Sequence, residues 1–331
     1  MKTRVGVVGC GAIFNRHEYA IDSNDDFELV QVCDIELSLC KTIAERKNIS
    51  YTTDYREMDV DLAVICTPNG EHFNQAKWFL DNKVDVLIEK PATIHAWQAR
   101  DLCKIAKENN RNVYCVLQVR LNPTVSFVKQ LLEENVLGDI RGVSLVQRWQ
   151  RPLSYFASWR NNPAVSGGTL HEVGIHYIDI LTHLLGEPKV VAGLSKKIKH
   201  INSNVKDSIY AILDFNSFAG TLEVTIAAEP SNLECSISIM GSNGFIKLGG
   251  KALNEIEAHN FLSRESDTQF SILRNKMLKE DETLPNDYGE YEGSCPNHAT
   301  LYRNLDKFRL ETTVSVLKTI ETIYRKTGDL Y

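Results

Sequence analysis

Short apolar stretches and longer amphipathic stretches alternate through the first third of the chain. The apolar stretches are rich in valine and isoleucine, which is typical of buried parallel strands, and the stretches between them repeat apolar positions at helical spacing. Strict alternation of strand and helix predicts right-handed crossovers and a parallel sheet. The predicted strands are 4–8, 28–33, 61–66, 84–88 and 112–119, and the predicted helices are 13–22, 36–48, 71–82 and 94–110, the last capped by Thr93.

Beyond about residue 138, strand-like stretches follow one another with few helices between them. The turns at 216–218 and 241–244 are short enough for hairpins, which predicts a largely antiparallel sheet. The other predicted elements are strands over 143–151, 189–197, 208–216, 219–228, 234–240 and 244–248, and helices over 123–135, over 170–185, from about 263, and over 310–326 after an acidic, turn-rich segment at 280–293.

Composition narrows the class of protein. With 331 residues the chain is long enough for two domains, and 43% hydrophobic with 24% charged residues is the composition of an ordinary globular protein. A net charge of -6 without basic clusters argues against a nucleic-acid partner, and no apolar run is long enough for a membrane span. Met1 to Arg4 leads straight into the first strand, and the eight cysteines form no Cys-x-x-Cys pair. We therefore expect a cytoplasmic protein with reduced thiols.

A glycine motif follows the first predicted strand. Gly9-Cys-Gly11-Ala12-Ile13 opens a helix, which is the context that a dinucleotide-binding fingerprint requires, although Phe14 stands where the strict pattern has its third glycine. The pyrophosphate of the cofactor would lie on the amino end of that helix. Asp34, at the end of the second strand, is placed to bind the ribose hydroxyls of NAD and to repel the 2′-phosphate of NADP. The alternative is that Asp34 only caps the next helix.

Two further polar motifs stand at the carboxyl ends of predicted strands, the edge at which doubly wound α/β folds bind ligands. Thr67-Pro68-Asn69 and His72 follow the third strand. They predict contacts with the nicotinamide ribose, unless they form only an Asn-Gly turn beside a surface histidine. Glu89-Lys90-Pro91 follows the fourth strand, where the fixed φ of proline ends the strand and aims Lys90 at this edge. The alternative is a surface Glu–Lys pair.

The densest group of polar residues lies between 166 and 179. Gly167 and Gly168 give the backbone freedom before a helix, on which Glu172 and His176 share one face with Asp179. A carboxylate and an imidazole so placed can abstract a proton from an alcohol. The same pair would suit a metal ion, but no third ligand stands nearby in the sequence, so we predict no metal.

These motifs, in this order, resemble those of the Gfo/Idh/MocA family, which includes glucose–fructose oxidoreductase and inositol dehydrogenase. The resemblance implies an α/β protein with an NAD-binding Rossmann domain over 1–121. It implies an α+β domain over 122–331, whose open-faced, largely antiparallel sheet forms a homo-oligomer, either a dimer or a tetramer. It also implies oxidation or reduction of sugar-like alcohols with Lys90 and His176 at the catalytic centre. Glu172 stands where inositol dehydrogenase-like members usually carry Asp, so the carboxylate is kept but reaches one methylene further.

Four further motifs are Leu117-Gln-Val-Arg120, Tyr155-Phe-x-Ser-Trp159-Arg160-x-x-Pro163, Gly174-Ile-His176-Tyr-Ile-Asp179 and Asn297-His298-x-x-x-Tyr302. Within the family, they resemble those of nucleotide-sugar 3-dehydrogenases that act on UDP-N-acetylglucosaminuronic acid. This similarity implies oxidation of a secondary alcohol, the C3 hydroxyl. Arg120 and Arg160 would bind a carboxylate or diphosphate, and Tyr155 and Trp159 would pack against the sugar or uracil. Two alternatives remain, a free-sugar or inositol dehydrogenase and a non-catalytic NAD- or sugar-sensing regulator. The resemblance adds Glu89, Lys90 and Gln118 to the cofactor contacts, and Asn297 and His298 to the substrate contacts.

The leading hypothesis assigns a role to each catalytic residue. His176 is a neutral base that takes the hydroxyl proton, so kcat/KM falls when it is protonated. Lys90 hydrogen-bonds the same oxygen and stabilises the developing negative charge. Glu172 positions or tunes that pair.

Overall fold

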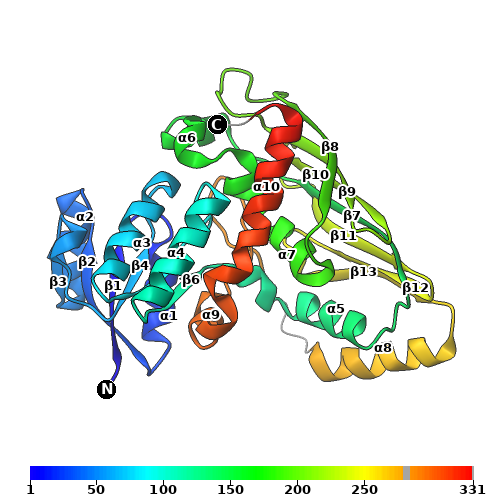
Figure 1. Ribbon diagram of the computed structural model, residues 1–331, viewed down its shortest axis with the longest axis horizontal. Helices are drawn as coiled ribbons and strands as arrows, with labels where there is room; N and C mark the ends of the chain where they lie inside the picture. The colour runs from blue at the N-terminus through cyan, green and yellow to red at the C-terminus, as the bar shows by residue number, and fades with distance from the viewer. Residues whose placement is uncertain (279–283, 330–331) are drawn as a thin grey trace. The chain divides into compact units, whose positions relative to one another are not determined.

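The computed structural model describes residues 1–278 and 284–329 of the chain, which form two compact units (Figure 1). The first unit comprises residues 1–117, 164–167 and 298–317, and the second contains the rest of the described residues. Each unit is therefore built from segments that are distant in the sequence.

The first unit contains a six-stranded parallel sheet with the order β3-β2-β1-β4-β5-β6. The order reverses beside β1, as in a doubly wound Rossmann domain, so the predicted fold of this part is confirmed. Apolar residues of the central strands, such as Val7 and Ile65, are completely buried. The strands are β1 (Thr3–Val8), β2 (Phe27–Cys33), β3 (Ser50–Thr52), β4 (Leu62–Ile65), β5 (Asp85–Ile88) and β6 (Val113–Cys115), and the helices between them are α1 (Phe14–Asp22), α2 (Leu37–Lys47), α3 (His72–Asp81) and α4 (Ala96–Glu108).

Three details of this unit differ from the prediction. The edge strand β3 was missed, because it is three residues long and only Thr52 is buried, which gives no periodic pattern. β6 ends at Cys115 and does not reach residue 119, because residues 118–121 turn into a 3-10 helix. Thr93 does not cap α4. The N-cap is His95, and the Thr93 hydroxyl donates to the His95 carbonyl at 2.9 Å.

The second unit contains a seven-stranded sheet with the order β13-β12-β11-β7-β10-β9-β8. Only the β7–β10 pair is parallel among the described strands of this sheet, and both predicted hairpins are present, so the largely antiparallel sheet is confirmed. β13 was missed because its residues are mostly polar and exposed. The strands are β7 (Ile140–Arg148), β8 (Lys189–Lys196), β9 (Ser208–Asp214), β10 (Ala219–Thr225), β11 (Glu234–Gly241), β12 (Gly244–Gly249) and β13 (Glu255–Phe261), and the helices are α5 (Pro123–Glu133), α7 (Ile175–Leu185) and α8 (Arg264–Met277).

Helices cover one face of this second sheet. α7 packs against β7, and α5 packs against α7 and α8. Figure 1 shows α5 and α7 on one side of the sheet and, among the described helices of this unit, none on the other. On that other face Leu194, Ile212, Met240 and Phe245 are exposed by 53%, 52%, 53% and 42%. The uncovered face therefore presents apolar side chains from four of the seven strands.

The last part of the chain returns to the first unit. The short helix α9 (His298–Tyr302) packs against α1, and Arg309 forms a β-bridge with Tyr114 of the edge strand β6. α6 (Pro163–Ser166) and the start of α10 (Val314–Thr327) also belong to this unit. The first unit is thus completed by residues that lie nearly 200 positions further along the chain.

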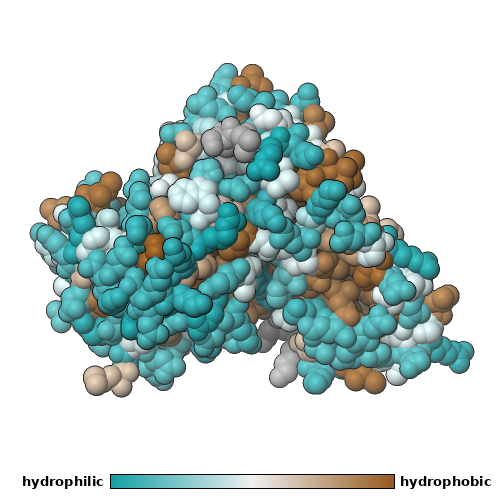
Figure 2. All heavy atoms as spheres, in the orientation of Figure 1, coloured by the Kyte–Doolittle hydropathy of each residue, from teal (hydrophilic) through white to brown (hydrophobic). Residues whose placement is uncertain are grey.

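The surface, the thiols and the helix lengths add three facts. Hydrophilic residues cover most of the face of the first unit that Figure 2 shows, and hydrophobic residues appear there in small groups. All eight cysteines are free thiols, as predicted. Among the described residues, no helix combines the length and the apolar character needed to cross a membrane.

Candidate active site

The loop between β1 and α1 passes very close to the neighbouring strand end. Gly9 has a φ of +98°, and a Cβ on it would lie 2.7 Å from backbone atoms of Cys66, so no larger residue fits there. A Cβ on Gly11 would meet nothing within 4 Å, which leaves that side of the loop open. α1 then begins at Phe14 without a side-chain cap on its first N–H groups. An open backbone turn before an uncapped helix suits a pyrophosphate, and Ala12 and Ile13 lie within that turn.

The Asp34 carboxylate is tied to this loop. Its Oδ2 accepts a hydrogen bond from the Cys10 N–H at 2.7 Å, and its Oδ1 accepts from the Glu36 N–H at 2.9 Å. Glu36, not Asp34, is the N-cap residue of α2. Asp34 is half-buried at the carboxyl end of β2. The carboxylate therefore lies beside the glycine loop, where the predicted ribose contact requires it.

Asp34→Ala is expected to lower the preference for NAD over NADP roughly tenfold, because it removes the charge that repels a 2′-phosphate. The measurement is the ratio of kcat/KM for the two cofactors. Asp34→Asn is the matched control, since it removes the charge and keeps a side-chain oxygen for one backbone N–H. If neither variant changes the ratio, Asp34 serves only to hold the loop.

One histidine, His72, holds the motif that was predicted to contact the nicotinamide ribose, Thr67-Pro68-Asn69. His72 lies within hydrogen-bond distance of two carbonyl oxygens, with Nδ1 2.8 Å from the Pro91 oxygen and Nε2 2.8 Å from the Thr67 oxygen. Asn69 is buried, and its amide donates to the Ser166 carbonyl at 2.8 Å. Thr67-Pro68-Asn69 and Pro91 therefore lie at the same edge of the sheet. Their contact with the nicotinamide ribose stays a prediction.

Glu89 and Lys90 follow β5 directly. The Glu89 N–H donates to the Ile65 carbonyl at 2.9 Å, which is the last hydrogen bond from this strand to β4. The next N–H, that of Lys90, donates to Glu89 Oε2 at 2.9 Å. The Lys90–Pro91 peptide bond is cis. His298, predicted to contact substrate, lies with Nε2 3.3 Å from Glu89 Oε1 and is 2% exposed. Within the part of the chain that the structure describes, His17, Glu89 and His298 are the one cluster with metal-ligand geometry.

In the second unit the predicted acid–base residues lie on a continuous helical segment. Gly167 and Gly168 have φ of +74° and +80°, and a π-helical turn over residues 170–174 precedes α7. Glu172 lies in the π turn and His176 in the first turn of α7, and both are at least 94% buried. The irregular turn means that the regular α-helical spacing assumed from the sequence does not hold between Glu172 and His176.

The Glu172 carboxylate binds two of the residues predicted to contact substrate. Arg160 Nε donates to Glu172 Oε2 at 2.8 Å, and the Tyr155 hydroxyl donates to the same oxygen at 3.3 Å. Burial lowers the pKa of Arg160, but the nearby Glu172 carboxylate and Tyr155 outweigh burial and raise this pKa overall. The guanidinium also lies over the rings of Trp159 and Tyr155, at 4.7 and 5.1 Å from their centroids. Tyr155, Trp159, Arg160 and Glu172 thus form one polar–aromatic group.

Three other predicted residues each bind a partner outside this group. Arg120 forms a buried ion pair with Asp179, 2.5 Å between Nη2 and Oδ1. Gln118 donates to the Ser294 hydroxyl at 3.2 Å, and Asn297 donates to Asn122 Oδ1 at 2.7 Å. No observation here tests the ligand contacts predicted for Gln118, Arg120 and Asn297, which stay predictions.

Arg151 is a candidate site residue that the sequence analysis did not single out. It is 3% exposed, and its guanidinium lies 4.2 Å from the ring centroid of Tyr291, 4.7 Å from that of Trp149 and 5.8 Å from that of Tyr155. Burial lowers the pKa of Arg151, and among the described residues no carboxylate pairs with it. The only feature of the sequence that could have pointed to it is its position, as the last residue of the predicted strand 143–151 and directly before Pro152.

Comparison with known proteins identifies the family. Residues 3–116 match the model of an oxidoreductase family with an NAD-binding Rossmann fold, and residues 129–328 match the C-terminal alpha/beta domain of the same family, Gfo/Idh/MocA. The chain belongs to the Gfo/Idh/MocA oxidoreductase family. It is an NAD-dependent oxidoreductase, and the predicted family, enzyme class and cofactor are confirmed.

Three similar proteins illustrate the range of the family. The structure of the WlbA dehydrogenase from Bordetella pertussis, in complex with NADH and UDP-GlcNAcA, is 25% identical with a TM-score of 0.86, over 99% of this chain and 96% of that one. The scyllo-inositol 2-dehydrogenase (NADP(+)) IolW of Bacillus subtilis (strain 168) is 25% identical over 98% of this chain and 85% of its own length. The D-glucoside 3-dehydrogenase of Escherichia coli (strain K12) is 24% identical over 65% and 67%.

The residues present fit the cofactor that the family implies. The Gly9–Ile13 turn offers open backbone to a pyrophosphate, and Asp34 lies beside it as an acceptor for ribose hydroxyls.

A cavity of about 500 Å³ opens in the same unit, but Thr3, Phe27, Leu62 and Asp85 line it at the amino ends of the strands. It lies at the edge of the sheet opposite to the one that holds the cofactor in this fold.

Proposed function

We propose that the protein oxidises the C3 hydroxyl of UDP-N-acetylglucosaminuronic acid, or of a closely related nucleotide-linked hexuronic acid. The observation that carries the proposal is the likeness to the WlbA dehydrogenase, which extends over 99% of this chain and whose structure holds UDP-GlcNAcA. The Escherichia coli relative is also named for oxidation at carbon 3. A substrate of the sugar or polyol class is common to these proteins and to the inositol dehydrogenase.

The proposed mechanism divides the work between two side chains. The Lys90 ammonium donates a hydrogen bond to the C3 oxygen and stabilises negative charge as it develops there. His176, neutral at the start, takes the proton from the same oxygen. NAD supplies the hydride acceptor when it is bound. Glu172, held by Arg160 and Tyr155, acts as a positioning residue for this pair.

The charges around Tyr155 favour an anionic sugar. Arg151 and Arg160 lie on the ring of Tyr155 at 5.8 and 5.1 Å, and Glu172 is the one carboxylate that the described residues place in this group. Two guanidinium groups against one carboxylate leave one positive charge in a largely buried environment. A uronate or diphosphate would neutralise that charge, whereas a neutral polyol would not.

A panel of substrates tests the proposal. Purified protein and NAD are mixed with UDP-N-acetylglucosaminuronic acid, UDP-N-acetylglucosamine or myo-inositol, and the absorbance of reduced nicotinamide is followed. The first two differ only at carbon 6, so the uronate is expected to raise kcat/KM about 10- to 100-fold, the effect of one charge-assisted hydrogen bond. Turnover of inositol with inert UDP-sugars would replace the proposal by the second candidate, a free-polyol dehydrogenase.

The proposal includes a homo-oligomer formed through the second sheet. Its uncovered face presents Leu194 and Ile212 on the neighbouring strands β8 and β9, and Met240 and Phe245 on the neighbouring strands β11 and β12. Exposed apolar groups of this kind are typical of a protein–protein interface. Ion pairs such as Arg148–Glu223 lie on the same face and would add charged groups to the interface between subunits. Sedimentation velocity of the wild type and of Ile212→Asp tests this, since a wild-type monomer would contradict it.

A further inference from the structure

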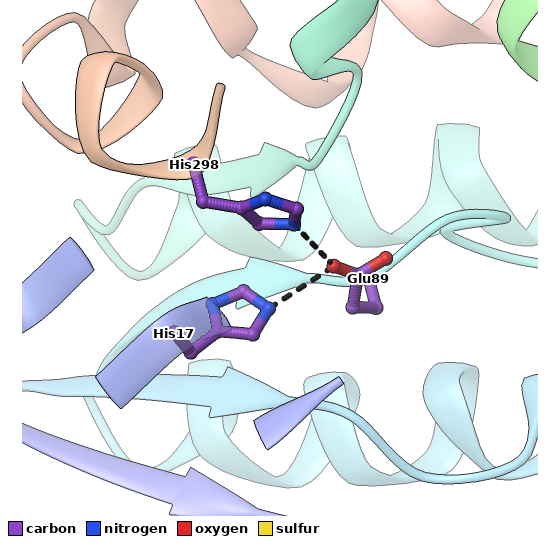
Figure 3. Close-up of side chains that lie close together, drawn as sticks. All are labelled: His17, Glu89 and His298. Carbon is purple, nitrogen blue, oxygen red and sulfur yellow. Dashed lines mark hydrogen bonds and ion pairs between the residues drawn. The ribbon is translucent and has the colours of Figure 1, made fainter. Parts of the chain in front are cut away.

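Two histidines hold the carboxylate that precedes Lys90. Glu89 Oε1 lies 3.0 Å from Nε2 of His17 on α1 and 3.3 Å from Nε2 of His298 on α9. Figure 3 shows both imidazole rings directed at this one oxygen. The side chains of His17, His298 and Glu89 are 0%, 2% and 10% exposed. A buried carboxylate thus receives two hydrogen bonds on one oxygen, from elements far apart in the sequence.

The protons of this cluster follow from its partners. An ionised carboxylate only accepts, so each imidazole presents an N–H at Nε2. Neutral His17 then has its lone pair at Nδ1, 2.9 Å from the Tyr302 oxygen, so the Tyr302 hydroxyl donates to it. Tyr302 therefore fixes the tautomer of His17 that Glu89 requires.

The directions of two pKa shifts agree with this assignment. Burial would raise the pKa of Glu89, but the hydrogen bonds from His17 and His298 outweigh burial and hold this pKa well below its usual range. Burial lowers the pKa of His17, which keeps the imidazole neutral.

The second oxygen of Glu89 connects the cluster to Lys90. The Glu89 N–H still pairs with β4, through the Ile65 carbonyl, whereas the Lys90 N–H donates to Glu89 Oε2 at 2.9 Å. The orientation of the Glu89 carboxylate therefore fixes the orientation of the Glu89–Lys90 peptide group, the first one beyond the strand. The Lys90 side chain begins directly after this peptide group. Any rotation of Glu89 would break the bonds to the histidines or the bond to Lys90.

We propose that His17, His298 and Tyr302 are positioning residues, which orient Lys90 through Glu89 for the reaction. This inference rests on the proposed function, because it assumes that Lys90 contacts the reacting hydroxyl. It assigns a role in the chemistry to α9, a helix of five residues near the end of the chain.

Glu89→Gln and Tyr302→Phe test the inference. Glu89→Gln keeps the size of the side chain and replaces one oxygen by a donor, and we expect kcat to fall about 100-fold with the Kd for NAD within twofold. Tyr302→Phe keeps the ring contact with Phe27, at 5.4 Å between centroids, and we expect kcat to fall roughly three- to tenfold. Tyr114→Phe is the matched control, because this hydroxyl makes no hydrogen bond with described residues, and its kcat should stay at the wild-type value.

The readouts separate positioning from stability. A purely structural role would lower the melting temperature and the fraction of active protein, and kcat per active site would stay unchanged, which would overturn the inference. Equal losses of kcat and NAD affinity would also overturn it. If Lys90→Met is inactive while Glu89→Gln is not, only this inference fails. If Lys90→Met keeps its activity, the proposed chemistry itself fails.

A metal assay covers the other arrangement that the same atoms allow. Dialysis of the wild type against a chelator is expected to leave kcat unchanged, because hydrogen bonds alone hold the cluster. Loss of kcat on chelation and its recovery with Zn²⁺ would contradict the inference and show that the two imidazoles and the carboxylate hold a metal ion.

Discussion

Replacing Lys90 by methionine is expected to lower kcat about 10²- to 10³-fold while the Kd for NAD stays within about a factor of two. Methionine keeps an unbranched chain of similar length and removes the ammonium, so the variant loses the group that stabilises charge on the reacting oxygen. An interaction made mainly in the transition state affects kcat and not ground-state binding. The glycine loop and Asp34, which lie on other strands, stay intact. Single-turnover absorbance measures the rate, and a fluorescence titration measures the affinity.

Lys77→Met is the control for this experiment. Lys77 lies on α3 of the same unit and forms a partly exposed ion pair with Asp81 at 3.0 Å, so its loss should leave both quantities unchanged. If Lys90→Met weakens NAD binding as much as it slows turnover, Lys90 acts on the cofactor and the proposed assignment is wrong.

Replacing His176 by asparagine is expected to lower kcat/KM about 10²- to 10⁴-fold, the contribution of a general base. The profile of kcat/KM against pH provides a second readout. In the wild type kcat/KM falls on the acid side as the base becomes protonated, and in the variant this acid limb disappears. The measurement is a series of initial rates across the pH range in which the wild type stays folded.

His183→Asn is the control on the same helix. Burial lowers the pKa of His183 to about 4, so this group is neutral in the range of the assay and its loss should leave the acid limb in place. An unchanged acid limb in His176→Asn would assign the proton to another residue, and Glu172 would then be the first candidate.

The sequence predicted most of the fold because its buried strands carry their own signal. Runs such as Val84–Ile88 are apolar and β-branched, and each is followed by a helix with one apolar face, so the parallel direction of the strands in the first sheet followed from alternation. The strands that were missed, β3 and β13, lie at sheet edges and bury few side chains. β3 and β13 have little burial to record in the sequence, so the pattern alone did not reveal them.

Side-chain partners were much harder to predict than motifs. The motifs placed Glu89, Glu172 and Arg160 among the functional residues. They did not predict which residues bind the polar groups of these side chains. Arg160 was expected to bind substrate, and it binds Glu172 in the structure. No pattern connected His17 with Glu89 or with Tyr302, because these two partners lie 72 and 285 positions away from it. Such contacts depend on tertiary packing, which local periodicity does not encode.

The return of α9 to the first unit has a consequence for synthesis of the protein in the cell. The 180 residues from Gln118 to Asn297 separate the first stretch of this unit from α9. A ribosome that adds about 5–20 residues per second needs about 10–35 seconds to make them. During that interval α1 lacks its packing partner, Tyr114 lacks its bridge to Arg309, and the Glu89 carboxylate has one histidine in place of two. The nascent Rossmann sheet therefore stays incompletely covered until residues 298–317 have been synthesised.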